Sequence, residues 1–243
     1  MAQAVAEISG AVHCLGRPRL LDTGWCYRGD GHASSVDEAA WEPFHEHVAA
    51  AHDMLARHKA VASLDPHYYA VMADIYVAEG RSGEEFAALL KEAAGREPYY
   101  YPLYDEAFRY YEPQWFGSHE AEEALASLAV EHTRAKDRTS AFARVYWHAM
   151  ECSCLPPPEA LNLPVLRQSM KDLAELYPDP WNVAHLAKMA CAIRDPDLAR
   201  QYFETLPRGD DGQSGWETWG GVDIERWTTC RTLAGLRQSA LAN

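Results

Sequence analysis

The sequence predicts an all-α fold, a helical-repeat solenoid of antiparallel helix pairs that follows an irregular N-terminal segment. Three observations predict it. Apolar residues recur at spacings of three and four over long stretches, which is the period of a helix with one buried face. Helix-start signals, either Asp-Pro or Ser followed three residues later by Glu, recur along the chain. The segments DPHYYAV and EPYYYPL begin at Asp65 and Glu97, 32 residues apart, and such self-similarity is typical of helical repeats.

Residues 1–34 are predicted to be irregular, because five glycines and Pro18 interrupt any helical or strand period there. The glycines of RGDGHASS, residues 28–35, are typical of a turn that leads into a helix. They also allow a second interpretation, because exposed amides near a helix start attract anions. An enzyme that uses this 28–35 loop therefore stays open as an alternative.

A repeat domain is predicted over residues 35–206. Its first helix begins at Ser35, which is expected to form a capping box with Glu38. One face of this helix is predicted to be buried, because its apolar residues recur at spacings of three and four. These residues are Trp41, Phe44, Val48, Ala51 and Leu55.

Three Asp-Pro pairs predict further helix starts, because Asp accepts hydrogen bonds from free amides and Pro has no amide to lose. The pairs lie at residues 65–66, 179–180 and 195–196. Gly80 is predicted to end the helix over 66–79, and Ser82 to begin the helix over 83–95 with a second capping box. These two segments are therefore expected to form a helix pair joined by a tight turn.

The stretch EPYYYPLYDEAFRYYEPQWFGS, residues 97–118, is rich in aromatic residues. Five of them share one helical face and are predicted to pack against neighbouring helices: Tyr100, Tyr104, Phe108, Tyr111 and Trp115. The off-face tyrosines are candidates for a binding surface, because tyrosine is favoured in binding sites. Two acidic neighbours would then select a basic partner. The predicted partner-binding residues are Tyr99, Tyr101, Asp105, Glu106 and Tyr110.

The second half of the chain is predicted to continue the helical pattern. Helices are expected over residues 118–135, 138–152 and 164–176, the first of them capped by Ser118. Residues 207–243 are predicted to form a linker and a C-terminal helix that caps the end of the repeats.

One helix pair carries a recognisable pattern. In WNVAHLAKMACAIRDPDLARQYFETLP, Ala187, Ala199 and Phe203 stand at spacings of 12 and 4. Small residues there let two helices approach closely, and the unit resembles a tetratricopeptide repeat. The wider chain, over about residues 28–206, is similar to an uncharacterised bacterial family of tetratricopeptide-like proteins known as domain of unknown function 4034. The stretches that carry this resemblance are RGDGHASSV, HKAVASLDPHYY, EPYYYPLYDEAFRYYEPQWFGS and YPDPWNVAHLAKMACAIRD.

The resemblance implies a tetratricopeptide-like solenoid. By analogy with such solenoids, it also implies noncatalytic binding of a protein or peptide along a concave helical surface. The chain departs from the regular pattern in two ways. Its offset of 32 residues, from Asp65 to Glu97, is shorter than the usual repeat. The proline-rich stretch CLPPPEALNLP, residues 154–164, also interrupts the repeats.

The composition restricts the classes of partner. With 36 acidic and 22 basic residues, the formal net charge is -14. This charge disfavours nonspecific binding to nucleic acid or to anionic membranes, and it permits a basic protein partner. The six cysteines form no CxxC pair, no secretory signal is recognisable, and no long apolar run could span a membrane. We therefore expect a cytoplasmic protein with reduced thiols and no cofactor.

Two groups of residues are candidate metal ligands. His148 and Cys152 are four residues apart on a predicted helix, and Cys154 lies just beyond. A zinc site needs four ligands, or three and a water, and no fourth ligand stands at a recognisable spacing. His45 and His52 could share a helix face, but nothing else marks a site there. A metal-binding protein that uses the first group stays an alternative to the binding module.

Overall fold

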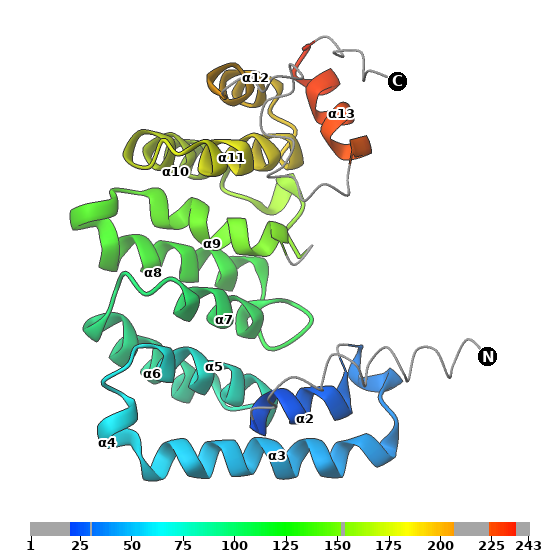
Figure 1. The fold of residues 1–243 in the computed structure, drawn as a ribbon, viewed down its shortest axis with the longest axis vertical. Coiled ribbons are helices and arrows are strands. Elements are labelled where there is room, and N and C mark those ends of the chain that lie inside the picture. The colour runs from blue at the N-terminus through cyan, green and yellow to red at the C-terminus, as the bar shows by residue number, and fades with distance from the viewer. Residues whose placement is uncertain (1–19, 30, 152–153, 207–223, 237–243) are drawn as a thin grey trace. The chain divides into compact units, whose positions relative to one another are not determined.

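The computed structural model describes residues 20–29, 31–151, 154–206 and 224–236. Within these ranges the fold is all-α, with twelve α-helices, two short 3-10 helices and no strand. Consecutive helices pack against one another in pairs (Figure 1). The all-α prediction is therefore confirmed. None of the helices in these ranges is long and apolar enough to cross a membrane. The chain divides into two compact units, Met1–Tyr110 and Tyr111–Asn243.

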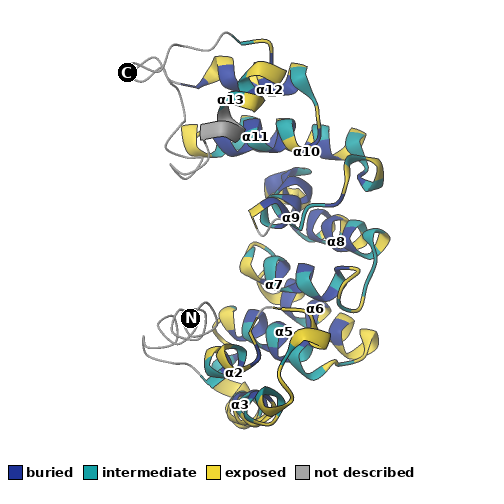
Figure 2. Cartoon of the chain, turned by 90° about the vertical axis from the view of Figure 1, so that its right-hand side faces the viewer, coloured by how far each residue is buried: buried dark blue, intermediate teal, exposed yellow. Residues whose placement is uncertain are grey.

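The first unit is built from helices that surround α5. Its described elements are α2 (Leu20–Arg28), η1 (Ala33–Ser35), α3 (Glu38–Arg57), α4 (Lys59–Ala62), α5 (His67–Glu79), α6 (Gly83–Arg96) and α7 (Pro102–Tyr111), which ends at the boundary between the units. α3 packs against α2 and α5, and α5 packs against α6. Ile75 of α5 and Phe86 of α6 are fully buried. Figure 2 shows that these helices carry both buried and exposed residues.

The predicted helix pair over residues 66–95 is present as α5 and α6. Gly80 ends α5 with a φ of 63°, a left-handed conformation that glycine adopts without strain. Ser82 and Glu85 form the predicted capping box of α6. The start of α3 differs from the prediction, because its N-cap is Asp37, whose Oδ1 accepts a hydrogen bond from Ala39 N at 2.9 Å. The Ser35 hydroxyl instead donates to His32 O within η1.

The expectation that residues 1–34 are irregular is wrong for residues 20–28, which form α2. Leu21, Gly24 and Arg28 are its buried residues, one face at spacings of three and four. A Cβ at Gly24 would lie 3.3 Å from both His47 Cβ and Phe44 O of α3. A glycine that interrupts the sequence pattern is thus what lets α2 approach α3 closely.

The second unit is built from the helices that follow α7. Its described elements are α8 (His119–Asp137), α9 (Ser140–Glu151), η2 (Pro158–Ala160), α10 (Leu163–Leu176), α11 (Pro180–Ala192), α12 (Pro196–Thr205) and α13 (Ile224–Leu233). α11 contacts α9, α10, α12 and α13. The predicted caps Ser118, Asp179 and Asp195 are confirmed at the starts of α8, α11 and α12. Of the linker and C-terminal helix predicted over residues 207–243, residues 207–223 lie outside the described residues, and α13 is the predicted helix.

The close approach predicted for the 181–207 pair is also present. Ala187 of α11 and Ala199 of α12 are fully buried, and Phe203 is buried beside them. Small side chains at this contact leave room for the two helices to pack tightly, as the sequence spacing indicated.

The expectation of reduced thiols is wrong for the described cysteines. Cys191 of α11 and Cys230 of α13 form a disulfide with a Cα–Cα distance of 5.6 Å. Cys26 and Cys154 are disulfide-bonded as well. The Cys191–Cys230 bond could not be read from local spacing, because its residues are 39 apart and meet only where α13 packs on α11.

Candidate functional site

The residues predicted to bind a partner lie in α7 and in the turn before it. Tyr99 is 39% exposed, whereas Tyr101, Asp105 and Glu106 are half-buried. Tyr110 is buried, with 4% of its surface exposed. The structure therefore leaves four of these five residues with surface that a partner can reach.

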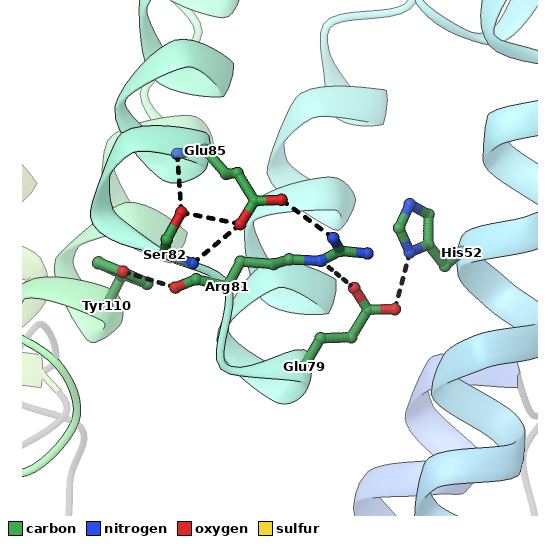
Figure 3. A network of polar contacts seen from close by, with 6 residues as sticks. All are labelled: His52, Glu79, Arg81, Ser82, Glu85 and Tyr110. Atoms are coloured by element: carbon green, nitrogen blue, oxygen red, sulfur yellow. Dashed lines mark hydrogen bonds and ion pairs between the residues drawn. The ribbon is translucent and has the colours of Figure 1, made fainter.

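Tyr110 belongs to the core of the first unit. Its ring stacks on that of Phe86 with a centroid distance of 3.8 Å. Its hydroxyl donates a hydrogen bond of 2.8 Å to Arg81 O, which holds α7 against the turn between α5 and α6 (Figure 3). The buried face of α7 is wider than the predicted stripe, and it includes Tyr104 and Phe108 as expected but also Tyr110. Burial raises the pKa of Tyr104 to about 12.

The same turn carries an ion-pair network that reaches α3. Glu79 accepts a hydrogen bond of 2.7 Å from Arg81 Nε and lies 2.7 Å from His52 Nδ1 (Figure 3). Arg81 Nη1 also donates to Glu85 of the capping box. These contacts involve both ends of the α5–α6 turn, so we assign the network a structural role.

The candidate metal ligands are not brought together. In the parts of the chain that the structure describes, no group of three or more His, Cys, Asp or Glu side chains could hold a metal ion. Cys154 is disulfide-bonded and so offers no thiolate, while Cys152 lies outside the described residues. His148 lies in α9, half-buried.

A polar cluster joins three helices of the first unit, and we call it the Asp74 cluster: Asp22, Trp25, Asp74, Glu106 and Arg109. Asp74 of α5 is its centre. Its Oδ1 accepts a hydrogen bond of 2.8 Å from Arg109 Nη1 of α7, and its Oδ2 accepts one of 3.2 Å from Trp25 Nε1 of α2. The Arg109 guanidinium carbon also lies 5.4 Å from the centroid of the Trp25 ring, within cation–π range.

The carboxylates of this cluster carry more negative charge than the Arg109 guanidinium can neutralise. Burial raises the pKa of Asp74, Arg109 and the Trp25 hydrogen bond lower it, and Asp22 raises it again, with a net increase. Burial likewise raises the pKa of Glu106, where repulsion by Asp74 adds to the increase and Arg109 opposes it. One guanidinium thus serves two half-buried carboxyls that also repel each other.

The 28–35 loop lies next to this cluster. Arg28 places its guanidinium carbon 5.3 Å from the Trp25 ring centroid and 5.5 Å from that of Trp41. The same guanidinium donates hydrogen bonds to the carbonyl oxygens of Gly29 and Gly31. The start of the loop is therefore fixed beside Trp25 by the side chain of its own first residue.

The arrangement favours the binding of a cation. Burial is the main reason that the pKa values of Asp74 and Glu106 are raised, and a positive charge placed near these carboxylates would stabilise their ionised forms. The Trp25 ring already carries the guanidinium groups of Arg28 and Arg109, so an added cation would meet the carboxylates and not the ring face. Asp74 has only 18% of its side chain exposed, whereas Arg109 is 40% exposed, so part of the cluster reaches the surface.

Of these five residues, only Glu106 is a candidate from the sequence. Trp25 and Asp22 lie in the segment predicted to be irregular, and no local pattern marks Arg109. A usable signal existed for Asp74, which is an isolated acid within the largely apolar stretch HYYAVMADIYV. A charge in such a stretch needs a buried partner.

Comparisons with protein-family models, with curated proteins and with solved structures yield no match to the chain. The family resemblance inferred from the sequence therefore stays a prediction.

Proposed function

We propose that the chain is a noncatalytic, tetratricopeptide-like binding module that recognises a basic segment of a protein or peptide partner. The Asp74 cluster is the contact site in this proposal. A lysine or arginine of the partner would approach Asp74 and Glu106 beside the Trp25 ring. Exposed surface at Tyr99 and Asp105 would extend the contact along α7.

The observation that carries the proposal is the arrangement of charges: Arg109 Nη1 donates to Asp74 Oδ1 at 2.8 Å, and the same guanidinium is the positive charge that acts on Glu106. A partner cation would reduce the repulsion between Asp74 and Glu106 and would be attracted by the net charge of -14. The pairing of consecutive helices and the small residues between α11 and α12 support the tetratricopeptide-like assignment.

A direct test measures the binding of labelled arginine-rich and lysine-rich peptides of equal length by fluorescence anisotropy. The test variant is Asp74→Asn/Glu106→Gln, which keeps the shapes of both side chains and removes two charges. We expect the affinity of the variant to be lower by at least about tenfold, because the loss of a partly desolvated charge pair speeds dissociation of the peptide.

The matched control is Glu131→Gln/Glu204→Gln, which removes two charges from exposed positions of α8 and α12. It changes the net charge by the same amount but leaves the Asp74 cluster intact. We expect less than a twofold loss of affinity, because exposed and distant charges are screened by salt. Equal losses in both variants would show general attraction to an acidic surface and would reject the site.

A further inference from the structure

A second cluster of side chains in the second unit has a different chemical character. Trp147 of α9 and Trp181 and His185 of α11 form a triangle of three rings. The centroid distances are 5.0 Å between the two indoles, 4.5 Å from Trp147 to His185, and 4.1 Å from Trp181 to His185. Trp181 is nevertheless 53% exposed, so an indole that is held in place by its neighbours faces solvent.

His185 supplies a hydrogen-bond acceptor at the base of this triangle. The imidazole is 5% exposed, and its Nδ1 lies 2.8 Å from Trp181 O. A carbonyl oxygen can only accept, so Nδ1 carries the proton. Burial lowers the pKa of His185, which keeps the ring neutral and leaves a lone pair on Nε2. The ion-pair neighbour of Nε2 is Glu151 Oε1 at 3.8 Å, another acceptor and beyond hydrogen-bond length.

A donor completes the set of polar groups. Lys188 Nζ donates a hydrogen bond of 3.2 Å to Glu151 Oε1, and 44% of the Glu151 side chain is exposed. The charges of Lys188 and Glu151 cancel. The His185 side of the triangle therefore carries an ion pair without net charge, with Glu151 Oε1 3.8 Å from His185 Nε2.

We propose that Trp181, together with Trp147, Glu151, His185 and Lys188, forms a binding site for a neutral carbohydrate. The apolar face of a pyranose ring would stack on the Trp181 indole. Its hydroxyls would donate to His185 Nε2 and Glu151 and accept from Lys188, because a hydroxyl is both donor and acceptor. The chain would then carry two sites with different ligands, and this one does not depend on the Asp74 cluster.

Charge complementarity favours a sugar over the other ligands that use tryptophan. A cationic peptide would be repelled by Lys188, which already occupies Glu151. A purely apolar segment would leave the His185 acceptor and the ion pair without solvent or partner, which is unfavourable. A neutral ligand with one apolar face and several hydroxyls satisfies all three groups.

The test is affinity gel electrophoresis of the full chain in gels that contain one soluble neutral polysaccharide each: hydroxyethyl cellulose, starch, galactomannan, xylan or glycol chitin. We expect retardation in at least one gel, and about a tenfold or greater loss of affinity in Trp181→Ala, the loss typical of removing an exposed aromatic anchor. Val165→Ala removes an exposed apolar side chain from α10 and is expected to migrate as the unmodified chain does.

A second variant separates stacking from hydrogen bonding. His185→Phe keeps an aromatic ring in the triangle and removes Nε2, so we expect it also to bind more weakly while its circular dichroism spectrum is unchanged. Retardation in none of the five gels would overturn the proposal. Equal retardation of the unmodified chain and Trp181→Ala would overturn it as well. So would binding of a proline-rich or arginine-rich peptide, lost in Trp181→Ala, in place of polysaccharide.

Discussion

Tyr110 allows the clearest distinction between a core residue and a binding residue in this chain. Its ring is 4% exposed and stacks on Phe86, which is fully buried. Replacing a buried aromatic side chain with alanine costs about 3–5 kcal/mol of unfolding free energy, because contacts are lost and a cavity remains. Stacking of the two rings contributes about 0.5–1.5 kcal/mol in addition to the burial of their surface. We therefore expect Tyr110→Ala to lower the unfolding free energy by about 4 kcal/mol.

Tyr110→Phe keeps the ring and removes only the hydroxyl. The hydrogen bond of 2.8 Å to Arg81 O is then lost, which costs about 1 kcal/mol for a typical neutral pair. The two variants are compared by urea unfolding, followed by far-ultraviolet circular dichroism, with Tyr99→Ala as the exposed control. The expected order of stability is unmodified chain, Tyr110→Phe, Tyr110→Ala. If Tyr110→Ala unfolds at the midpoint of Tyr99→Ala, the ring is not part of the core and this reasoning is refuted.

Three further predictions follow from other parts of the fold. Gly24→Leu should detach α2 from α3 at a cost of about 1–3 kcal/mol from overpacking, which faster proteolysis near residues 20–28 would reveal. Removing the disulfide in Cys191→Ser/Cys230→Ser should destabilise the α13 attachment by about 4 kcal/mol, from the chain entropy of a 39-residue loop, and hydrogen exchange in α13 would measure the change. The folded-state pKa of Asp74 is raised, so its contribution to stability is complete at low pH and is lost as pH rises through that pKa. The stability of Asp74→Asn relative to the unmodified chain should therefore rise from acidic to neutral pH. The pKa of Asp195 is lowered, so the relative stability of Asp195→Asn should instead fall by on the order of 1 kcal/mol over the same range. Thermal melts at several pH values measure both changes.

Helix starts were predictable from the sequence because they depend on residues within one turn. Ser82, Ser118 and Asp179 accept hydrogen bonds from amides two or three positions ahead, and no distant contact is needed. Ser35 shows the limit of this reasoning. Two residues later, Asp37 offers a competing acceptor at the same helix start, and Asp37 is the one that caps α3.

The N-terminal helix was not predictable in this way. α2 has a buried face of only Leu21, Gly24 and Arg28, of which only Leu21 is a large apolar residue, so the sequence shows no apolar stripe there. Glycine lowers helix propensity, so the local pattern favoured an irregular segment. The contact with α3 opposes this preference, because a Cβ at Gly24 would lie only 3.3 Å from Phe44 O and His47 Cβ.

The candidate site was hidden for a related reason. Trp25, Asp74 and Arg109 come from three helices, and 84 positions of the sequence separate the first from the last. No spacing rule connects them. Glu106 was a candidate because it is an acidic neighbour of the off-face tyrosines, not because its neighbour Asp74 could be predicted.

Two carboxylates of the chain show why the Asp74 cluster is more than a structural ion pair. Asp195 and Asp74 each pair with an arginine, at 2.6 Å and 2.8 Å, but Asp74 is surrounded by more protein than Asp195 is. Burial raises the pKa of Asp195, but the amide of Leu198 and the guanidinium of Arg167 outweigh burial and lower it.

Asp74 has the opposite balance. It lies within α5, where the backbone amides are already bonded, so it caps no helix start, and Asp22 repels its charge. Its ionised form is therefore unfavourable in the folded chain, even though Arg109 and Trp25 hold it in place. A carboxylate that serves stability alone is better placed at a helix start, as Asp195 is. A carboxylate that is held in position although burial makes its ionised form unfavourable is suited to bind a cationic ligand, because the ligand stabilises that ionised form.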